Sequence, residues 1–219
     1  RMLIPLRNYS NYSICESNIK IDDLVNFAEK EKLPAIALTD YKLLSGVLEF
    51  SIKCQKKGIQ PIIGLDVDYL SILKNYSRLT ILSKNENGFK NLNILSTKIN
   101  TENDFQLSLR NINDFSDGNI LILGGLYSYF EDLNINKTNL KVILDEINTL
   151  KKTFNSDIFF ELDENLDNKL LNEISQKCNI NCFLSSFSFY KQDKDFDAIK
   201  ILYLSLINIS EPTRHSSIS

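Results

Sequence analysis

The stretch Leu33-Pro-Ala-Ile-Ala-Leu-Thr-Asp-Tyr41, together with Gly58-Ile-Gln-Pro-Ile-Ile-Gly-Leu-Asp66, decides the fold that the sequence predicts. Residues 35–38 and 61–63 are continuous apolar runs without polar alternation, as expected for parallel strands that are covered on both faces. Between them, residues 44–57 place apolar side chains on one helical face, and a glycine follows where a helix would end. The stretch therefore predicts a βαβ unit with a right-handed crossover.

The same alternation of strand and helix continues along the chain, apart from a polar, weakly periodic segment at 101–118. Further strands are expected at 2–6, 79–82, 120–123, 158–162 and 182–185, and helices at 21–32, 87–99, 140–154, 166–177 and 195–206. About seven such units predict an α/β fold with a parallel sheet closed into a barrel. We expect one domain, residues 1–210, and a disordered or non-native C-terminal tail at 211–219.

The composition is typical of a globular protein, with 43% hydrophobic residues, 24% charged residues and a net charge of −3 at pH 7. This charge argues against a surface that coats nucleic acid. No stretch has the roughly 20 consecutive apolar residues of a membrane helix, so no membrane partner is expected. The cysteines, Cys15, Cys54, Cys178 and Cys182, include no CxxC pair, which favours reduced thiols in a cytoplasmic protein.

Two carboxylates, Asp40 and Asp66, follow the two decisive strands at their C-terminal ends. In parallel α/β sheets this end carries the chemistry. The two side chains could bind a single metal ion, pair with Arg7, or cap helix N-termini, where a carboxylate is favoured. The chain's one histidine, His215, lies in the tail, so neither a His-rich metal site nor a Ser–His pair is expected in the domain.

The opening Arg7-Asn-Tyr-Ser-Asn-Tyr-Ser-Ile-Cys-Glu16, with the residues after it as far as Val25, resembles the first motif of PHP (polymerase and histidinol phosphatase) domains. Further matches are found at 34–40, 58–66, 78–95, 160–162 and 184–199. The chain resembles in particular the PHP domain that opens the alpha subunit of bacterial DNA polymerase III, a DNA-directed DNA polymerase of DNA replication. The resemblance implies the PHP fold, a distorted (β/α)7 TIM-like barrel, over residues 1–210.

Metal-binding members of this family hold divalent ions with His, Asp, Glu and Cys ligands at the C-terminal mouth of the barrel. The resemblance places these former metal-site positions on Arg7, Tyr9, Glu16, Tyr41, Asp66, Gly125, Ser186 and Ser188. Two carboxylates remain among them, too few for a multinuclear site, and Arg7 adds a fixed positive charge.

We therefore expect no catalytic residue, no bound metal and no cofactor. A salt bridge among Arg7, Asp40 and Asp66 is expected to replace the charge of the metal. Tyr9 and Tyr41 are expected to fill the vacated space, although tyrosines could also bind phosphate.

Three functions follow as hypotheses. The first is a metal-free, catalytically inactive scaffold, whose partners are the remaining domains of the polymerase alpha subunit and, as a further partner, the proofreading exonuclease subunit. In that case DNA is contacted only through the whole polymerase. The alternative is a metal-dependent phosphoesterase or 3'–5' exonuclease, as intact PHP domains are. The third is a free-standing binding module.

Overall fold

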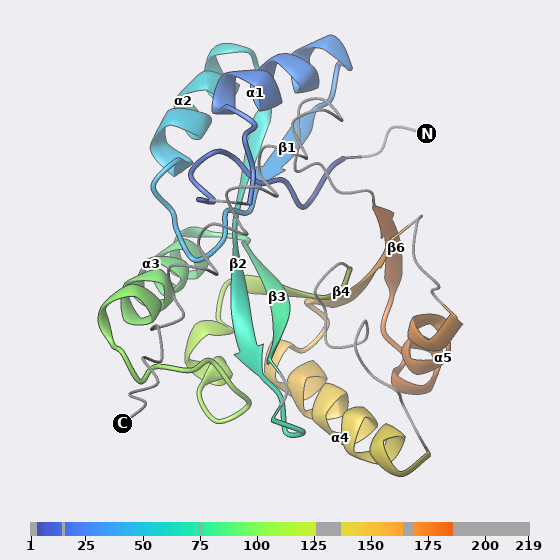
Figure 1. The fold of residues 1–219 in the computed structure, drawn as a ribbon. Helices are drawn as coiled ribbons and strands as arrows, with labels where there is room; N and C mark the ends of the chain where they lie inside the picture. The colour runs from blue at the N-terminus through green and yellow to red at the C-terminus, as the bar shows by residue number, and fades with distance from the viewer. Residues whose placement is uncertain (1–3, 15, 75, 126–136, 164–168, 186–219) are drawn as a thin grey trace, which may run out of the picture.

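The computed structural model describes residues 4–14, 16–74, 76–125, 137–163 and 169–185. Within these ranges, strands and helices alternate as the sequence predicts, except between the second and third strands (Figure 1). The elements are α1 (Ile21–Lys30), β1 (Ala35–Leu38), α2 (Val47–Lys56), β2 (Gln60–Leu70), β3 (Tyr76–Ser83), α3 (Glu86–Thr101), the 3-10 turn η1 (Ile112–Phe115), β4 (Asn119–Gly124), α4 (Lys137–Phe154), β5 (Ile158–Asp163), α5 (Lys169–Cys178) and β6 (Cys182–Ser185). None of the helices in this part of the chain is long and apolar enough to cross a membrane.

The six strands form one sheet in the order β1-β2-β3-β4-β5-β6. The pairs β1–β2, β4–β5 and β5–β6 are parallel, but β3 pairs antiparallel with both of its neighbours. The expectation of an all-parallel sheet was therefore wrong at β3. Only residues 71–75 separate β2 from β3, and a parallel crossover needs a dozen or more residues.

The sheet curls into a half-barrel with the helices on its outer side, in agreement with the predicted distorted TIM-like barrel (Figure 1). The helix expected at 195–206 and the tail expected at 211–219 lie outside the described residues. The strand expected at 2–6 falls partly outside them, and residues 4–6 are not assigned as strand. Pro5 offers a physical reason, because proline has no N–H to give to a strand ladder.

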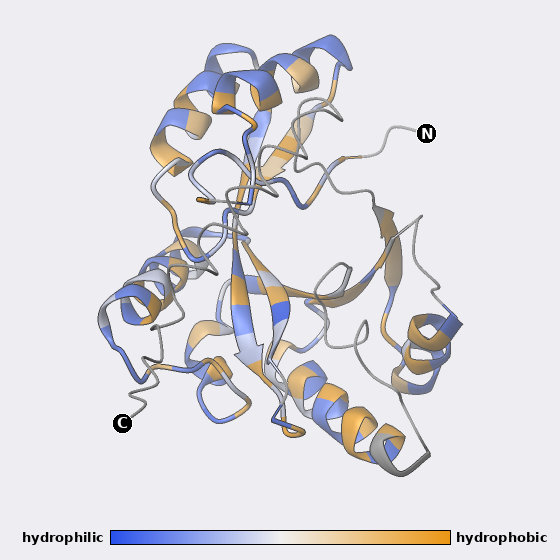
Figure 2. Cartoon of the chain, viewed as in Figure 1, coloured by the Kyte–Doolittle hydropathy of each residue, from blue (hydrophilic) through white to orange (hydrophobic). Residues whose placement is uncertain are grey.

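Two apolar clusters fill the space between the sheet and the helices. The larger one lies behind β2 to β5, and the smaller one packs β1 against α1 and α2. Along β2, Leu65, Val67 and Tyr69 belong to the larger cluster, so the alternation of the strand directs Asp66 and Asp68 to the opposite, concave face. The helices also carry both kinds of side chain. Figure 2 shows this on α4, where hydrophobic and hydrophilic patches alternate along the helix.

The N-terminal segment, described for residues 4–14 and 16–19, runs beside β1 on the way to the first helix. Asn8 donates its backbone N–H to Thr39 Oγ1 at 3.0 Å, and its carbonyl accepts the N–H of Thr39 at 2.8 Å. The side chain of Asn8 also donates to the carbonyl of Ala37 at 2.9 Å. These bonds fix the backbone next to Arg7, which therefore enters the concave side of the sheet.

Candidate functional site

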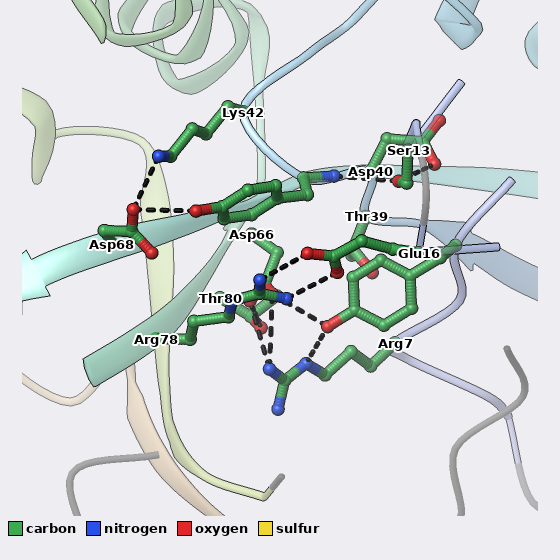
Figure 3. A network of polar contacts seen from close by, with 12 residues as sticks. Arg7, Ser13, Glu16, Thr39, Asp40, Lys42, Asp66, Asp68, Arg78 and Thr80 are labelled. Atoms are coloured by element: carbon green, nitrogen blue, oxygen red, sulfur yellow. Dashed lines mark hydrogen bonds and ion pairs between the residues drawn. The ribbon is translucent and has the colours of Figure 1, made fainter. Parts of the chain in front are cut away.

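A network of buried charged side chains lies on the concave side of the sheet (Figure 3). Arg7 and Tyr9 come from the N-terminal segment, Asp66 from β2 and Glu161 from β5. The side chains of Arg7, Asp66 and Glu161 are at most 2% exposed. Ionised groups are so rarely buried without partners that the contacts of these three define the site.

Arg7 is the centre of the network. Its Nη2 lies 3.2 Å from Asp66 Oδ1 and 3.3 Å from Asp66 Oδ2, and its Nη1 lies 2.9 Å from Glu161 Oε2. Nη1 also approaches the carbonyl of Gly124 at 3.4 Å, and Nε donates to the Tyr9 hydroxyl at 2.8 Å. One guanidinium thus connects the N-terminal segment with β2, β4 and β5.

The groups around Arg7 shift the pKa values of Arg7 and Tyr9. Burial by itself would lower the pKa of Arg7, but Asp66, Tyr9 and Glu161 together raise that pKa well above its usual value. Burial raises the pKa of Tyr9 in turn, with Asp66 acting in the same direction and Arg7 against it. Tyr9 therefore stays protonated and donates its hydroxyl to Asp66 Oδ2 at 2.8 Å. Thr80 on β3 donates to the other oxygen, Asp66 Oδ1, at 2.9 Å.

A second arginine, Arg78 on β3, forms the next layer of the network. Its guanidinium pairs with both carboxylate oxygens of Glu16, one contact being 2.6 Å, and lies 3.7 Å from Asp66 Oδ2. The same guanidinium stacks 3.9 Å from the ring centroid of Tyr41, whose hydroxyl donates to Asp68 Oδ2 at 2.7 Å. Burial lowers the pKa of Arg78, but the pair with Glu16 and the charge of Asp66 raise it overall.

Asp40 belongs to a separate, smaller cluster. Its carboxylate accepts the backbone N–H of Ser10 at 2.6 Å, the Ser10 hydroxyl at 2.7 Å and the Ser13 hydroxyl at 2.7 Å. The salt bridge that was expected to join Arg7, Asp40 and Asp66 is described between Arg7 and Asp66, and the described contacts of Asp40 are with Ser10 and Ser13. The chain turns after Arg7 so that the serine hydroxyls, and not the guanidinium, meet the end of β1.

The burial of Asp40 can be tested by measuring how the stability of the protein depends on pH. Burial raises the pKa of Asp40, and the hydrogen bonds from Ser13 and Ser10 only partly oppose this effect. A carboxyl whose pKa is raised in the folded state takes up protons on folding, so its contribution to stability falls as the pH rises above about 4, the ordinary aspartate pKa. Asp40→Asn, whose amide can donate to the Ser10 oxygen, is expected to remove this loss.

The measurement is urea unfolding of the unaltered chain and of Asp40→Asn at several pH values between 4 and 7. The free energy of unfolding of the variant, relative to that of the unaltered chain, should increase over this interval. Asp40→Ala, which leaves the buried donors of both serines without an acceptor, should lower the free energy of unfolding by about 1–3 kcal/mol at pH 4, and this loss should become smaller toward pH 7, because the variant also lacks the titrating carboxyl. A pH-independent difference for Asp40→Asn would contradict the assignment.

The structure gathers most of the expected former metal-site positions. Arg7, Tyr9 and Asp66 are in mutual contact, while Glu16 and Tyr41 both meet Arg78. Gly125 is buried and directly follows Gly124, whose carbonyl faces Arg7. Ser186 and Ser188 lie outside the described residues.

Glu161 and Arg78 were not predicted as site residues. Glu161 had the same sequence pattern as Asp40 and Asp66, a carboxylate at the end of a buried apolar strand, and this pattern could have found it. Arg78 could be placed only by knowing that β3 runs antiparallel, which directs it to the concave face with Asp66 and Asp68.

The side chains of this site do not fit the divalent metal cluster that the resemblance associates with PHP domains. Among the described residues, no group of three or more His, Cys, Asp or Glu side chains could hold a metal ion. The two most buried carboxylates, Asp66 and Glu161, are separated by the guanidinium of Arg7, which contacts both. The described arrangement satisfies the buried carboxylates with hydrogen bonds from Arg7, Tyr9 and Thr80.

Comparison with known proteins shows which family and fold the chain shares. The model of the PHP domain matches residues 5–165 of the chain. The DNA polymerase III alpha subunit of Chlamydia pneumoniae is 31% identical over 173 residues, which is 73% of this chain and 14% of that protein. The corresponding subunit of Borreliella burgdorferi is 28% identical over 228 residues, which is 91% of this chain and 19% of that protein. The chain thus spans a small part of these relatives.

Solved structures are similar in fold. An amidohydrolase from Chromobacterium violaceum superposes with a TM-score of 0.57 at 10% identity, over 87% of this chain and 88% of that one. A two-domain protein from Bacteroides vulgatus, described as containing a predicted PHP-like metal-dependent phosphoesterase, gives a TM-score of 0.57 at 13% identity, over 90% of this chain and 55% of that one. Because the family model covers the chain from the segment that carries Arg7 through β5, well over half of its length, the chain belongs to the PHP domain family.

Proposed function

We propose that this chain is the N-terminal PHP domain of a bacterial DNA polymerase III alpha subunit, and that it acts in DNA replication as a metal-free, catalytically inactive scaffold. The similarity to alpha subunits over 73% and 91% of the chain supports the first part of the proposal. The observation that carries the second part is the ion pair of Arg7 with Asp66 and Glu161, which occupies the concave face with a side chain of the protein itself.

The alternative activity, a metal-dependent phosphoesterase or 3'–5' exonuclease, requires ligands that hold a metal ion and a water next to the substrate. Instead, Arg7 and Arg78 make seven described hydrogen bonds to acceptors of the chain itself, which are carboxylates, a hydroxyl and a carbonyl. The carboxylates therefore already bind the two guanidinium groups. The described residues likewise include no histidine that could act as a general base, since His215 lies beyond them.

A scaffold acts through its interfaces. We propose that the remaining domains of the alpha subunit contact this domain, that the proofreading exonuclease subunit is a further partner, and that DNA is contacted only through the whole polymerase in the cytoplasm. Interfaces between domains of one chain typically bury about 600–1,500 Å². Deleting residues 1–207 from the intact subunit should therefore lower its stability and solubility.

The deletion is tested by comparing the melting temperature and the soluble yield of the intact and the shortened subunit. Primer extension by the remaining soluble enzyme, normalised to active sites, should keep its rate per site, because the polymerase carboxylates are not in this chain. Unchanged stability and yield would contradict the scaffold role. A coding sequence that does not continue into polymerase sequence would contradict the assignment to an alpha subunit.

Catalytic inactivity is tested directly on the chain. Hydrolysis of p-nitrophenyl phosphate and of 5'-labelled single-stranded DNA should not exceed a buffer control, with or without added Mn²⁺ or Zn²⁺. The control is the same preparation carrying Asp66→Ala, which distinguishes a contaminating enzyme from activity of this site. Turnover that requires added metal and disappears in Asp66→Ala would overturn the inactive scaffold.

A further inference from the structure

The surroundings of Arg7 match the donor pattern of a guanidinium. A guanidinium carries five N–H donors in a rigid plane. Nη2 faces both oxygens of Asp66, Nη1 faces Glu161 and the carbonyl of Gly124, and Nε faces the Tyr9 hydroxyl, at 2.8–3.4 Å in all cases. These acceptors come from four different parts of the chain. The arrangement that complements the guanidinium is therefore formed by the fold as a whole.

The same acceptors do not suit a divalent metal ion. Metal–oxygen bonds in proteins are roughly 2.0–2.6 Å long and converge on one point. Here Asp66 and Glu161 contact opposite nitrogens of a planar group, and no third carboxylate, histidine or cysteine of the described chain joins them. Asp66 is further committed to the hydroxyls of Tyr9 and Thr80.

We propose that the concave face carries a guanidinium-binding site, which Arg7 fills as an intramolecular ligand. The site selects a planar cation with several N–H donors over a divalent metal ion or a simple ammonium ion. It connects the N-terminal segment, which has no helix or extended strand before α1 in its described residues, with β2, β4 and β5. This inference stands on the contacts of Arg7 and is independent of the role in a polymerase.

Two properties of the site support this selectivity. The site is buried, because the side chains of Arg7, Asp66 and Glu161 are at most 2% exposed, and hydrogen bonds are electrostatically stronger in such an interior than in bulk water. Carboxylates also bind a guanidinium through directed hydrogen bonds, whereas an ammonium ion acts as a compact point charge. A cation of the wrong shape would leave some of these acceptors buried without a donor.

The test is chemical rescue of Arg7→Gly. This variant lacks the three methylenes and the guanidinium, which n-propylguanidinium replaces as a free molecule. We expect millimolar n-propylguanidinium to raise the melting temperature of Arg7→Gly along a saturable curve, and to leave that of the unaltered chain unchanged. At ten times its dissociation constant, the ligand should increase the folding equilibrium constant about tenfold.

Matched ligands and variants define the selectivity. n-Propylammonium, Mn²⁺ and Zn²⁺ should give no saturable shift with Arg7→Gly. Adding Glu161→Gln to Arg7→Gly should weaken n-propylguanidinium binding at least tenfold, whereas adding Lys90→Ala, which alters an exposed pair with Glu86, should not change it.

Two results would overturn the proposal: a shift with Mn²⁺ or Zn²⁺ that equals or exceeds the shift with n-propylguanidinium, or no shift with n-propylguanidinium at all. If Arg7→Gly is unfolded at 20 °C, the same titration is followed by circular dichroism as ligand-induced refolding. If it stays unfolded, the titration of Arg7→Gly is repeated in sucrose, an osmolyte that favours the folded state. Absence of a shift under these conditions also counts against the proposal.

Discussion

Replacing Arg7 with alanine is expected to lower the free energy of unfolding by about 3–5 kcal/mol at pH 7, the usual result of removing one partner of a buried ion pair. The change leaves Asp66 and Glu161, both 0% exposed, without their shared cation. The cost arises mainly from buried carboxylates that have lost their closest cation, with only Arg78, 3.7 Å from Asp66 Oδ2, still near one of them, and not from the intrinsic strength of the ion pair. Equilibrium unfolding in urea measures the difference.

The pH dependence of the loss in unfolding free energy shows whether Arg7→Ala acts by removing a positive charge or by removing packing contacts. Without Arg7 the two buried carboxylates lose their shared cation, and burial then favours their protonated forms, with Arg78, Tyr9 and Thr80 still opposing this effect at Asp66. A carboxyl that takes up a proton on folding costs stability as the pH rises, so the loss of stability in Arg7→Ala should be smaller at pH 5 than at pH 7. The triple variant Arg7→Ala/Asp66→Asn/Glu161→Gln should recover part of the stability at pH 7. A deficit under 1 kcal/mol would contradict the central role of Arg7.

Strands could be predicted from the sequence where one local pattern of apolar residues determines the structure. The apolar runs around Leu38 and Ile63 predicted adjacent parallel strands, and the structure pairs these two residues. Parallel strands bring their C-terminal ends together, and on this rule Arg7 and Asp66 could be expected near each other although 59 positions separate them. In the structure, residues 4–6 are not assigned as strand, and Arg7 is placed beside β1 by the bonds of Asn8 with Thr39 and Ala37.

The errors arose where tertiary structure overrode a local pattern. The alternation of strand and helix suggested only parallel strands, whereas the connection at 71–75 makes an antiparallel hairpin of β2 and β3. This hairpin brings Thr80 opposite Asp66 and Arg78 opposite Asp68. The spacing of apolar residues in a sequence does not show which strands pair or in which direction. Arg78 was therefore not predicted as a site residue.

Asp40 shows a different limit of the sequence. Its position at the end of β1 was predicted, but its partners depend on the path of the N-terminal segment, which has no periodicity to reveal it. Ser10 and Ser13 meet Asp40 because residues 10–13 form a turn, with the N–H of Ser13 bonded to the carbonyl of Ser10 at 2.9 Å. Side chains on irregular backbone are placed by such bonds, which a pattern of residue types does not encode.

Replacing Gly124 with alanine is the second change expected to have a large effect. Gly124 has φ +95°, and a Cβ at this position would overlap the backbone oxygen of Glu161. Alanine at positive φ costs about 1–2 kcal/mol, and relieving the overlap costs about 1–3 kcal/mol more because it displaces the backbone of β5. We expect a total loss of about 2–5 kcal/mol in the free energy of unfolding, measured in urea.

Gly58→Ala separates the two causes. Gly58 also has positive φ, at +68°, but a Cβ there would meet nothing within 4 Å, so only the conformational cost of about 1 kcal/mol applies. The excess loss in Gly124→Ala then measures the close approach of β4 to β5 beside the site. Because the carbonyl of Gly124 faces Arg7 and Glu161 pairs with it, this excess should shrink when Arg7 is already alanine. Equal losses for the two glycines, or additivity of Gly124→Ala with Arg7→Ala, would show that this approach does not support the network.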